Sequence, residues 1–138
     1  MVYQDSFTIK TPGRNTVEIT DHVTRILHNA NIKSGICNIF IRHTSASLVL
    51  CENADPAVRT DLETFMSSLV RDGDTQFRHQ TEGPDDMPAH IRSILTDNNL
   101  NLPVSGGRLA LGTWQGIYLY EHRYSPCNRD IMVTVYGD

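Results

Sequence analysis

Short segments in which apolar residues alternate with polar ones, or follow one another without a break, recur along the chain. Such segments are typical of β-strands, and proline and glycine mark the turns between them. The turn at 11–15 predicts a hairpin between its flanking strands, and apolar residues on both faces of 36–42 predict a central strand. The predicted strands cover 3–10, 16–20, 36–42, 47–53, 100–111 with an interruption at 106–107, 116–124 and 129–136.

Three other segments show the helical repeat of apolar residues. The first begins near residue 21, and the second begins at Asp55-Pro56, where a capping carboxylate precedes a proline at the first helical position. The third has Asp85 or Asp86 as its cap and tolerates Pro88 in its first turn. The three apolar faces consist of Val23, Ile26, Leu27 and Ala30; of Val58, Leu62, Phe65, Met66 and Leu69; and of Ile91, Ile94 and Leu95.

These seven or eight strands and three helices define the fold class. Short turns join most of the strands, and the helices are grouped in the middle of the chain. This order favours an α+β fold, in which an antiparallel or mixed sheet has the helices packed on one side. The 138 residues suffice for one domain with its own core, so 1–138 is expected to be a single domain. No glycine-rich phosphate loop is present, so no nucleotide cofactor is expected.

Composition narrows the classes of partner. The chain is 39% hydrophobic and 20% charged, and its net charge of -4 argues against a nucleic-acid-binding surface. No apolar run approaches the roughly 20 residues of a membrane helix, so no membrane partner is expected. Three widely spaced cysteines without a CxxC pair, and no recognisable signal peptide, predict reduced thiols and a cytoplasmic location.

Titratable side chains are concentrated between residues 77 and 90. His79 and His90 bracket a loop that carries Glu82 and two aspartates, which is a composition typical of a metal or phosphate site. His43, at the end of a predicted strand, can supply a third imidazole, and Glu82, Glu52 or Asp61 can orient one of the rings. Three imidazoles with an open position form a hydrolytic or Lewis-acid site. The alternative is three unrelated loop histidines with ordinary hydrogen bonds.

Hydroxyls and arginines suggest a second chemistry, the binding of an anion. Ser45 and its neighbours in HTSAS, together with Arg129 and two other arginines on the C-terminal strands, can hold a phosphate. A salt bridge between Arg123 and Glu121 would explain those two charges equally well. A serine nucleophile at Ser45 or Ser47 lacks the GxSxG elbow.

Two further polar residues are candidates for lining a site. Gln115 is costly to bury without hydrogen bonds, and it follows Trp114, which is either a core residue or part of the site. Asp61 lies off the centre of the second helix's apolar stripe, so it either reaches a neighbouring polar site or faces solvent.

Four segments together resemble the YjbQ-like family, which is associated with a secondary thiamine-phosphate synthase activity. These segments are HTSASLVLCENADPAVRTDLE at 43–63, the histidine at 79 with EGPDDMPAHI ending at 91, GRLALGTWQGIYLYEHR at 107–123 and the terminal RDIMVTVYG. The resemblance implies a largely antiparallel, sandwich-like α+β fold, a homotrimer, and a polar site near a subunit boundary. The matching motif positions are His43, Ser45, Glu52, Asn53, Asp61, His79, Glu82, His90, Gln115, Glu121 and Arg129.

The activity that the resemblance implies joins a pyrimidine diphosphate to a thiazole phosphate and releases pyrophosphate. A divalent metal and arginines would neutralise the leaving group. Histidine ligands favour zinc, whereas a diphosphate-bound magnesium ion prefers carboxylates, so either metal is a candidate. Three functions remain open: a transferase acting on phosphorylated small molecules, a metal-dependent hydrolase that uses the same histidines, and a non-catalytic ligand-binding trimer. In both enzymes His43, His79, His90, Glu82 and Asp61 are the expected catalytic residues, with Ser45, Gln115 and Arg129 binding substrate.

Overall fold

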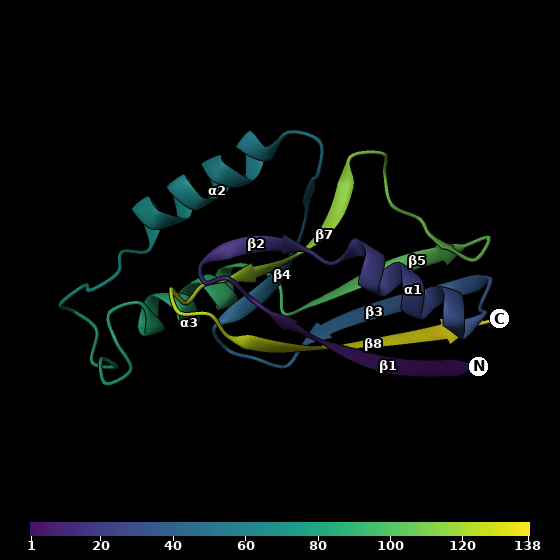
Figure 1. Ribbon diagram of the computed structural model, residues 1–138, viewed down its shortest axis with the longest axis horizontal. Coiled ribbons are helices and arrows are strands. Elements are labelled where there is room, and N and C mark those ends of the chain that lie inside the picture. The colour runs from purple at the N-terminus through teal and green to yellow at the C-terminus, as the bar shows by residue number, and fades with distance from the viewer.

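The computed structural model describes residues 1–138 and contains eight strands and three helices (Figure 1). This confirms the predicted α+β class and the element count. In chain order the elements are β1 (Val2–Lys10), β2 (Asn15–Glu18), α1 (Thr20–Ala30), β3 (Ser34–Ile41), β4 (Ala46–Glu52), α2 (Pro56–Leu69), α3 (Asp86–Leu95), β5 (Asn99–Ser105), β6 (Arg108–Leu109), β7 (Gln115–Glu121) and β8 (Asn128–Gly137).

The strands form two antiparallel sheets, with the orders β1-β8-β3-β5-β6 and β2-β7-β4. β3 lies between β8 and β5, as the apolar residues on both of its faces predicted. The predicted hairpin between the first two strands is wrong, because β1 pairs with β8 and β2 pairs with β7. The turn between them carries the chain from one sheet to the other. Its Gly13 lies so close to the Tyr124 carbonyl that a Cβ would collide there.

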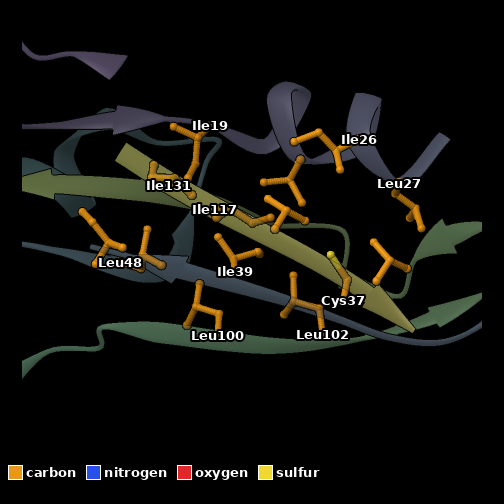
Figure 2. Packing of buried hydrophobic residues seen from close by; sticks show 14 of the residues in the cluster. Ile19, Ile26, Leu27, Cys37, Ile39, Leu48, Leu100, Leu102, Ile117 and Ile131 are labelled. Carbon is orange, nitrogen blue, oxygen red and sulfur yellow. The ribbon is translucent and has the colours of Figure 1, made fainter. Parts of the chain in front are cut away.

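The core fills the space between the two sheets and α1. It contains 19 buried apolar residues, and Figure 2 shows how isoleucines and leucines from β3, β4, β5, β7 and β8 meet those of α1. The apolar face predicted for α1 is the buried one. Cys37 on β3 is fully buried as a small apolar residue, and burial raises the pKa of its thiol to about 11. The first helix and the strand pattern therefore account for most of the core.

β7 is covered on both faces, because every residue from Gly116 to Glu121 is buried. Ile117 and Leu119 belong to the core cluster between the sheets. The residues between them point the other way: Tyr118 lies beneath the Arg59 guanidinium, and the Tyr120 hydroxyl donates to Glu63 on α2 at 2.6 Å. The outer face of the three-stranded sheet is thus a polar layer.

The polar layer explains why the other two helices differ from expectation. α2 begins as predicted, with the Asp55 carboxylate accepting from the Ala57 N–H at 2.9 Å, but Met66 is its only buried residue. α3 likewise leaves Ile94 81% and Leu95 55% exposed and buries Arg92 instead. Both apolar faces were expected to be covered by the rest of the chain, and they are largely exposed. None of the three helices is long and apolar enough to cross a membrane.

Arg92 joins α3 to α2 from a fully buried position. Its guanidinium donates to Glu63 at 2.7 Å and to Ser67 at 3.3 Å. The desolvation of a buried guanidinium is offset only by such paired, charge-assisted hydrogen bonds. The pKa of Glu63 is raised by its own burial but lowered more by hydrogen bonds from Arg92, Ser67 and Tyr120, so the carboxylate is ionised.

A second buried network ends at His122, which is fully buried. The Ser47 hydroxyl lies 2.8 Å from His122 Nε2, and the Thr96 hydroxyl lies 2.7 Å from both Ser47 Oγ and the Arg92 carbonyl. The carbonyl can only accept, so a hydrogen bond at each of these contacts requires Thr96 to donate to the carbonyl, Ser47 to donate to Thr96, and His122 Nε2–H to donate to Ser47. His122 Nδ1 is left without a partner. His122 is therefore neutral with its proton on Nε2. Burial lowers its pKa to about 3, and the charges of Arg92 and Arg14 contribute.

His122 makes the stability of the fold depend on pH. Because its pKa is depressed in the folded state, the unfolded chain binds one more proton between about pH 6.5 and pH 3. The free energy of unfolding should therefore fall as the pH drops through this range, by up to ~1.4 kcal/mol per pH unit from this group. In His122→Gln, the amide can still donate to Ser47. The dependence of the unfolding free energy on pH should then be weaker, by the amount that corresponds to about one bound proton. Urea unfolding at several pH values measures it.

The matched control is His28→Gln, since His28 is exposed at the end of α1. This variant should keep the wild-type slope. An unchanged slope in His122→Gln would show that the buried ring is not the group that takes up the proton.

Candidate functional site

Three side chains of types that can ligate a metal converge where the loop 71–85 enters α3. His79 Nε2 lies 2.6 Å from Asp86 Oδ2, and His90 Nε2 lies 3.2 Å from the same oxygen. One ligand atom from each of the three residues lies within 4.8 Å of the others. The carboxylate of Asp86 is almost fully buried, whereas the His79 ring is about half exposed. Two imidazoles and one carboxylate with an open side are a donor set suited to zinc or a similar divalent ion.

Local structure brings these residues together. Asp86 and His90 lie four residues apart on the first turns of α3, so their side chains share one face of the helix. His79 reaches the same place because the loop turns back at Gly83, which has a φ of 107° that favours glycine. The two imidazole rings are 5.3 Å apart between centroids.

Arg123 holds the carboxylates of the site in position. Its guanidinium donates to Asp85 at 3.0 Å, to Asp86 at 2.8 Å and to the Glu82 carbonyl at 2.7 Å. Burial alone would raise the pKa of Asp86, but hydrogen bonds with Glu82 and His79 and the charge of Arg123 hold that pKa below its usual value. Asp86 is therefore a carboxylate, and its Oδ2 atom is left to face the two imidazoles.

His90 is oriented from its other side. Its Nδ1 lies 3.1 Å from the Thr44 carbonyl oxygen, which can only accept, so Nδ1 carries a proton. In the neutral ring the Nε2 lone pair then faces the lone pairs of Asp86 Oδ2. A cation between them, whether a proton or a metal ion, removes this repulsion. The arrangement of an imidazole anchored through Nδ1–H to a carbonyl is the one that supports metal-ligating histidines.

His43 lies outside the group of three ligand atoms. Its Nε2 accepts a hydrogen bond from the Asp130 backbone N–H at 2.8 Å, which places the ring proton on Nδ1. Burial and the charge of Arg129 lower the pKa of His43, so its ring is neutral at pH 7. It shares with His90 a pocket of about 480 Å³ that is also lined by Ser93, Thr96 and Asn98. His43 is thus a neighbour of the cluster across a pocket.

Glu82, Asp61 and Gln115 occupy three different places. Glu82 is exposed beside the cluster, with its carboxylate 3.6 Å from His79 Nε2. Asp61 is exposed on α2. Gln115 begins β7, and its side-chain oxygen accepts from the Gly112 N–H at 2.8 Å. Of these three residues only Glu82 joins the histidines.

Ser45 and Arg129 do lie together, but Arg129 faces a carboxylate. Arg129 Nε donates to Glu121 at 2.8 Å, and its Nη2 donates to Ser45 Oγ at 2.9 Å. Arg129 is 5% exposed and Glu121 is fully buried, so this is a buried ion pair. The proposed side-chain pair between Arg123 and Glu121 is wrong. The Arg123 guanidinium turns to Asp85 and Asp86, and only its backbone N–H contacts Glu121.

The sequence did not identify Asp86 as a candidate metal ligand or Arg123 as the residue that holds its carboxylate. Both residues had simpler predicted roles, in a helix cap and in a salt bridge. Either Asp85 or Asp86 was expected to cap the helix, which is a structural role. The residue at the cap is Asp85, whose side chain makes no capping bond because it accepts from Arg123 and from the Tyr124 N–H. The signal that points to Asp86 is its four-residue spacing from His90 on a predicted helix.

Residues 5–138 match the family described as UPF0047 protein YjbQ-like. The chain belongs to this family. It is 46% identical over 136 residues to a UPF0047 protein of Synechocystis, covering 99% of this chain and 92% of that protein. It is 41% identical to the UPF0047 protein YjbQ of Escherichia coli O157:H7 over 139 residues, with full coverage of both.

A solved structure of a YbjQ-like protein from Sulfolobus solfataricus superimposes with a TM-score of 0.91 at 29% identity, over 100% of this chain and 99% of that one. An APE1520 protein from Aeropyrum pernix gives a TM-score of 0.90 at 28% identity, over 99% of each chain. The names of these relatives state no activity, so the residues of the YjbQ-like site carry the functional argument.

The cluster predicts which variants bind metal. His79→Ala, Asp86→Asn and His90→Ala should each weaken Co²⁺ or Zn²⁺ binding by roughly 100-fold or more, because each removes or neutralises one of three ligands. His43→Ala should stay within about threefold of wild type, because its ring lies outside the ligand group. Titration followed by Co²⁺ absorption measures both effects.

His28→Ala is the control for the loss of an imidazole in general, because His28 is exposed and lies far from the cluster in the sequence. If His43→Ala loses as much affinity as His90→Ala, the ligand set is the three histidines predicted from the sequence and not His79, Asp86 and His90.

Proposed function

We propose that this YjbQ-like protein is a divalent-metal-dependent transferase acting on phosphorylated small molecules, with an activity like that of a thiamine-phosphate synthase. The observation that supports the proposal is the convergence of His79, Asp86 and His90, whose ligand atoms all lie within 4.8 Å of one another. His79 completes the donor set from the exposed side. The family resemblance suggests the class of reaction, and the three side chains are the groups that would bind the metal.

A cation held there would polarise a phosphate oxygen or a water molecule and stabilise negative charge that develops during reaction. The protein's own groups then have distinct tasks. Arg123 keeps the Asp86 carboxylate ionised and aimed at the imidazoles. His43 presents its ring to the pocket that it shares with His90, where a neutral imidazole can hold or move a proton.

Charge in the neighbouring pockets sets a condition on this proposal. Neither the pocket beside His90 nor the smaller one beside His79, of about 290 Å³, is lined by lysine or arginine. A diphosphate bound in either pocket would therefore depend on the metal for neutralisation. The Arg129–Ser45 pair, proposed from sequence as a phosphate site, already has Glu121 as its anion, so we assign Arg129 to holding the Ser45 segment.

The composition of the ligand set supports a second candidate, a metal-dependent hydrolase. Magnesium bound through a diphosphate prefers carboxylate and water oxygens, whereas two imidazoles with one carboxylate are typical of zinc sites that activate water. The same residues would serve both reactions, so the products distinguish them.

We also propose a cytoplasmic homotrimer, which the resemblance implies. Exposed apolar side chains on α2 support an assembly: Phe65 is 62%, Leu69 57% and Leu62 38% exposed. Figure 1 shows α2 at the periphery of the molecule, where a second copy can reach it. The three cysteines are free thiols, as a reducing location favours.

The activity test uses metal-loaded protein with a hydroxymethylpyrimidine diphosphate and a thiazole phosphate. His79→Ala and His90→Ala should lower turnover by roughly 100-fold or more, since each removes a metal ligand. Formation of thiamine phosphate supports the transferase, and release of free hydroxymethylpyrimidine without a joined product supports the hydrolase. Full metal binding with neither product would favour the non-catalytic trimer.

The assembly test is Phe65→Asp, which places a charge on the exposed apolar face of α2. Sedimentation at dilute concentration should show trimers for wild type and smaller species for the variant, because the interface would have to bury that charge. Ser68→Asp, at an exposed polar position of the same helix, is the control and should remain trimeric. A wild-type protein that is monomeric at every concentration would refute the trimer.

A further inference from the structure

A separate polar pocket of about 440 Å³ lies between α2 and the strand pair β2 and β7. Arg59 lines it from α2, Asn15 and Thr16 line it from β2, and Tyr120 lines it from β7. None of the three metal-ligating residues is among its lining groups. Its volume is within the range of pockets that hold small molecules.

The charged groups that line this pocket, other than Arg59, already have partners. Glu63 is the only carboxylate of the lining, and it accepts from Arg92, Tyr120 and Ser67. Arg14 is paired with Asp72 through two hydrogen bonds of 2.7 and 2.9 Å. In these pairs each charge is neutralised by a partner within the chain. Arg59 is therefore the charged group of the pocket that is available to a ligand.

Arg59 is held in place but not neutralised. Its Nη1 donates to the Glu52 carbonyl at 2.8 Å, and its guanidinium carbon lies 4.8 Å from the centre of the Tyr118 ring. No carboxylate lies within 4.0 Å of it, and its Nε and Nη2 atoms have no hydrogen-bond acceptor in the chain. The guanidinium is therefore oriented in advance, with forked donors available.

Two other donors line the same pocket. The Asn15 side-chain oxygen accepts from the Thr16 backbone N–H at 2.8 Å, which leaves the Asn15 amide NH₂ without a protein acceptor. The Thr16 hydroxyl makes no hydrogen bond within the chain, and its residue is half-buried. A ligand rich in acceptors and carrying negative charge matches this set of donors.

We propose that the pocket between α2 and the β2–β7 pair binds an oxyanion, the phosphate or pyrophosphate group of a small molecule, through Arg59, Asn15 and Thr16. This site is independent of the His79–Asp86–His90 cluster, whose neighbouring pockets are not lined by lysine or arginine. The anion would bind without any metal ion, since the charge is provided by Arg59.

The test is calorimetric titration of EDTA-treated full-length protein with inorganic pyrophosphate. Removing metal silences the histidine cluster, so the remaining binding reports on this pocket. Arg59→Gln should raise the Kd by about tenfold or more, because it removes the positive charge and the paired guanidinium donors. Thr16→Val should raise the Kd by about threefold, because it removes one hydroxyl donor. Circular dichroism and thermal unfolding check that each variant is folded.

Arg71→Gln removes an equal charge just beyond the end of α2 and should leave the Kd within about twofold. His79→Ala and His90→Ala should bind pyrophosphate as wild type does, so a failure of the metal site leaves this result intact. The proposal is overturned if metal-free protein does not bind pyrophosphate, or if Arg59→Gln and Thr16→Val both bind it unchanged. A change in sedimentation of Arg59→Gln without a change in binding would instead assign Arg59 to a contact between protein chains.

Discussion

The contact between Arg123 and the aspartates at the start of α3 is the interaction on which the site depends. The segment from Arg71 to Asp85 makes few apolar contacts, because nearly all of its side chains are exposed or half-exposed. Arg123 ties the end of this segment to the chain just beyond β7 through two carboxylates and one carbonyl. Charge-assisted bonds at partly buried positions are strong enough to replace apolar packing here. They hold the Asp86 carboxylate and the end of the loop that leads into α3.

β7 connects this contact to the rest of the molecule. One of its faces supplies Ile117 and Leu119 to the core between the sheets, and the other supplies Tyr118 and Tyr120 to a polar layer under α2 and α3, which His122 joins just after the strand. Because the layer is held by hydrogen bonds and the buried Arg92, α2 and α3 are attached while most of their large apolar side chains stay exposed. The same layer produces both the exposed apolar surface of α2 and the pocket that Arg59 lines.

The two proposed sites carry opposite charge preferences. In the histidine cluster, His79 Nε2 and His90 Nε2 both face the Asp86 carboxylate. The pocket under α2 has a net need for an anion, since one guanidinium lacks a counter-ion. One site therefore presents ligand atoms suited to a cation, and the other presents hydrogen-bond donors suited to an anion.

The sequence by itself determined the α+β class, the number of strands and helices, the central place of β3, the buried face of α1 and the concentration of chemistry between residues 77 and 90. These follow from local periodicity and from residue types, which do not depend on distant partners. Only the tertiary structure decided that β1 pairs with β8, that the apolar faces of α2 and α3 stay exposed, and that Asp86 meets the histidines. It also decided the ion pairs. Arg123 pairs with Asp85 and Asp86, and Glu121 pairs with Arg129. Strand partners and ion pairs join residues far apart in the chain, and a charge or an alternating pattern is compatible with many such partners until the backbone places one of them within reach.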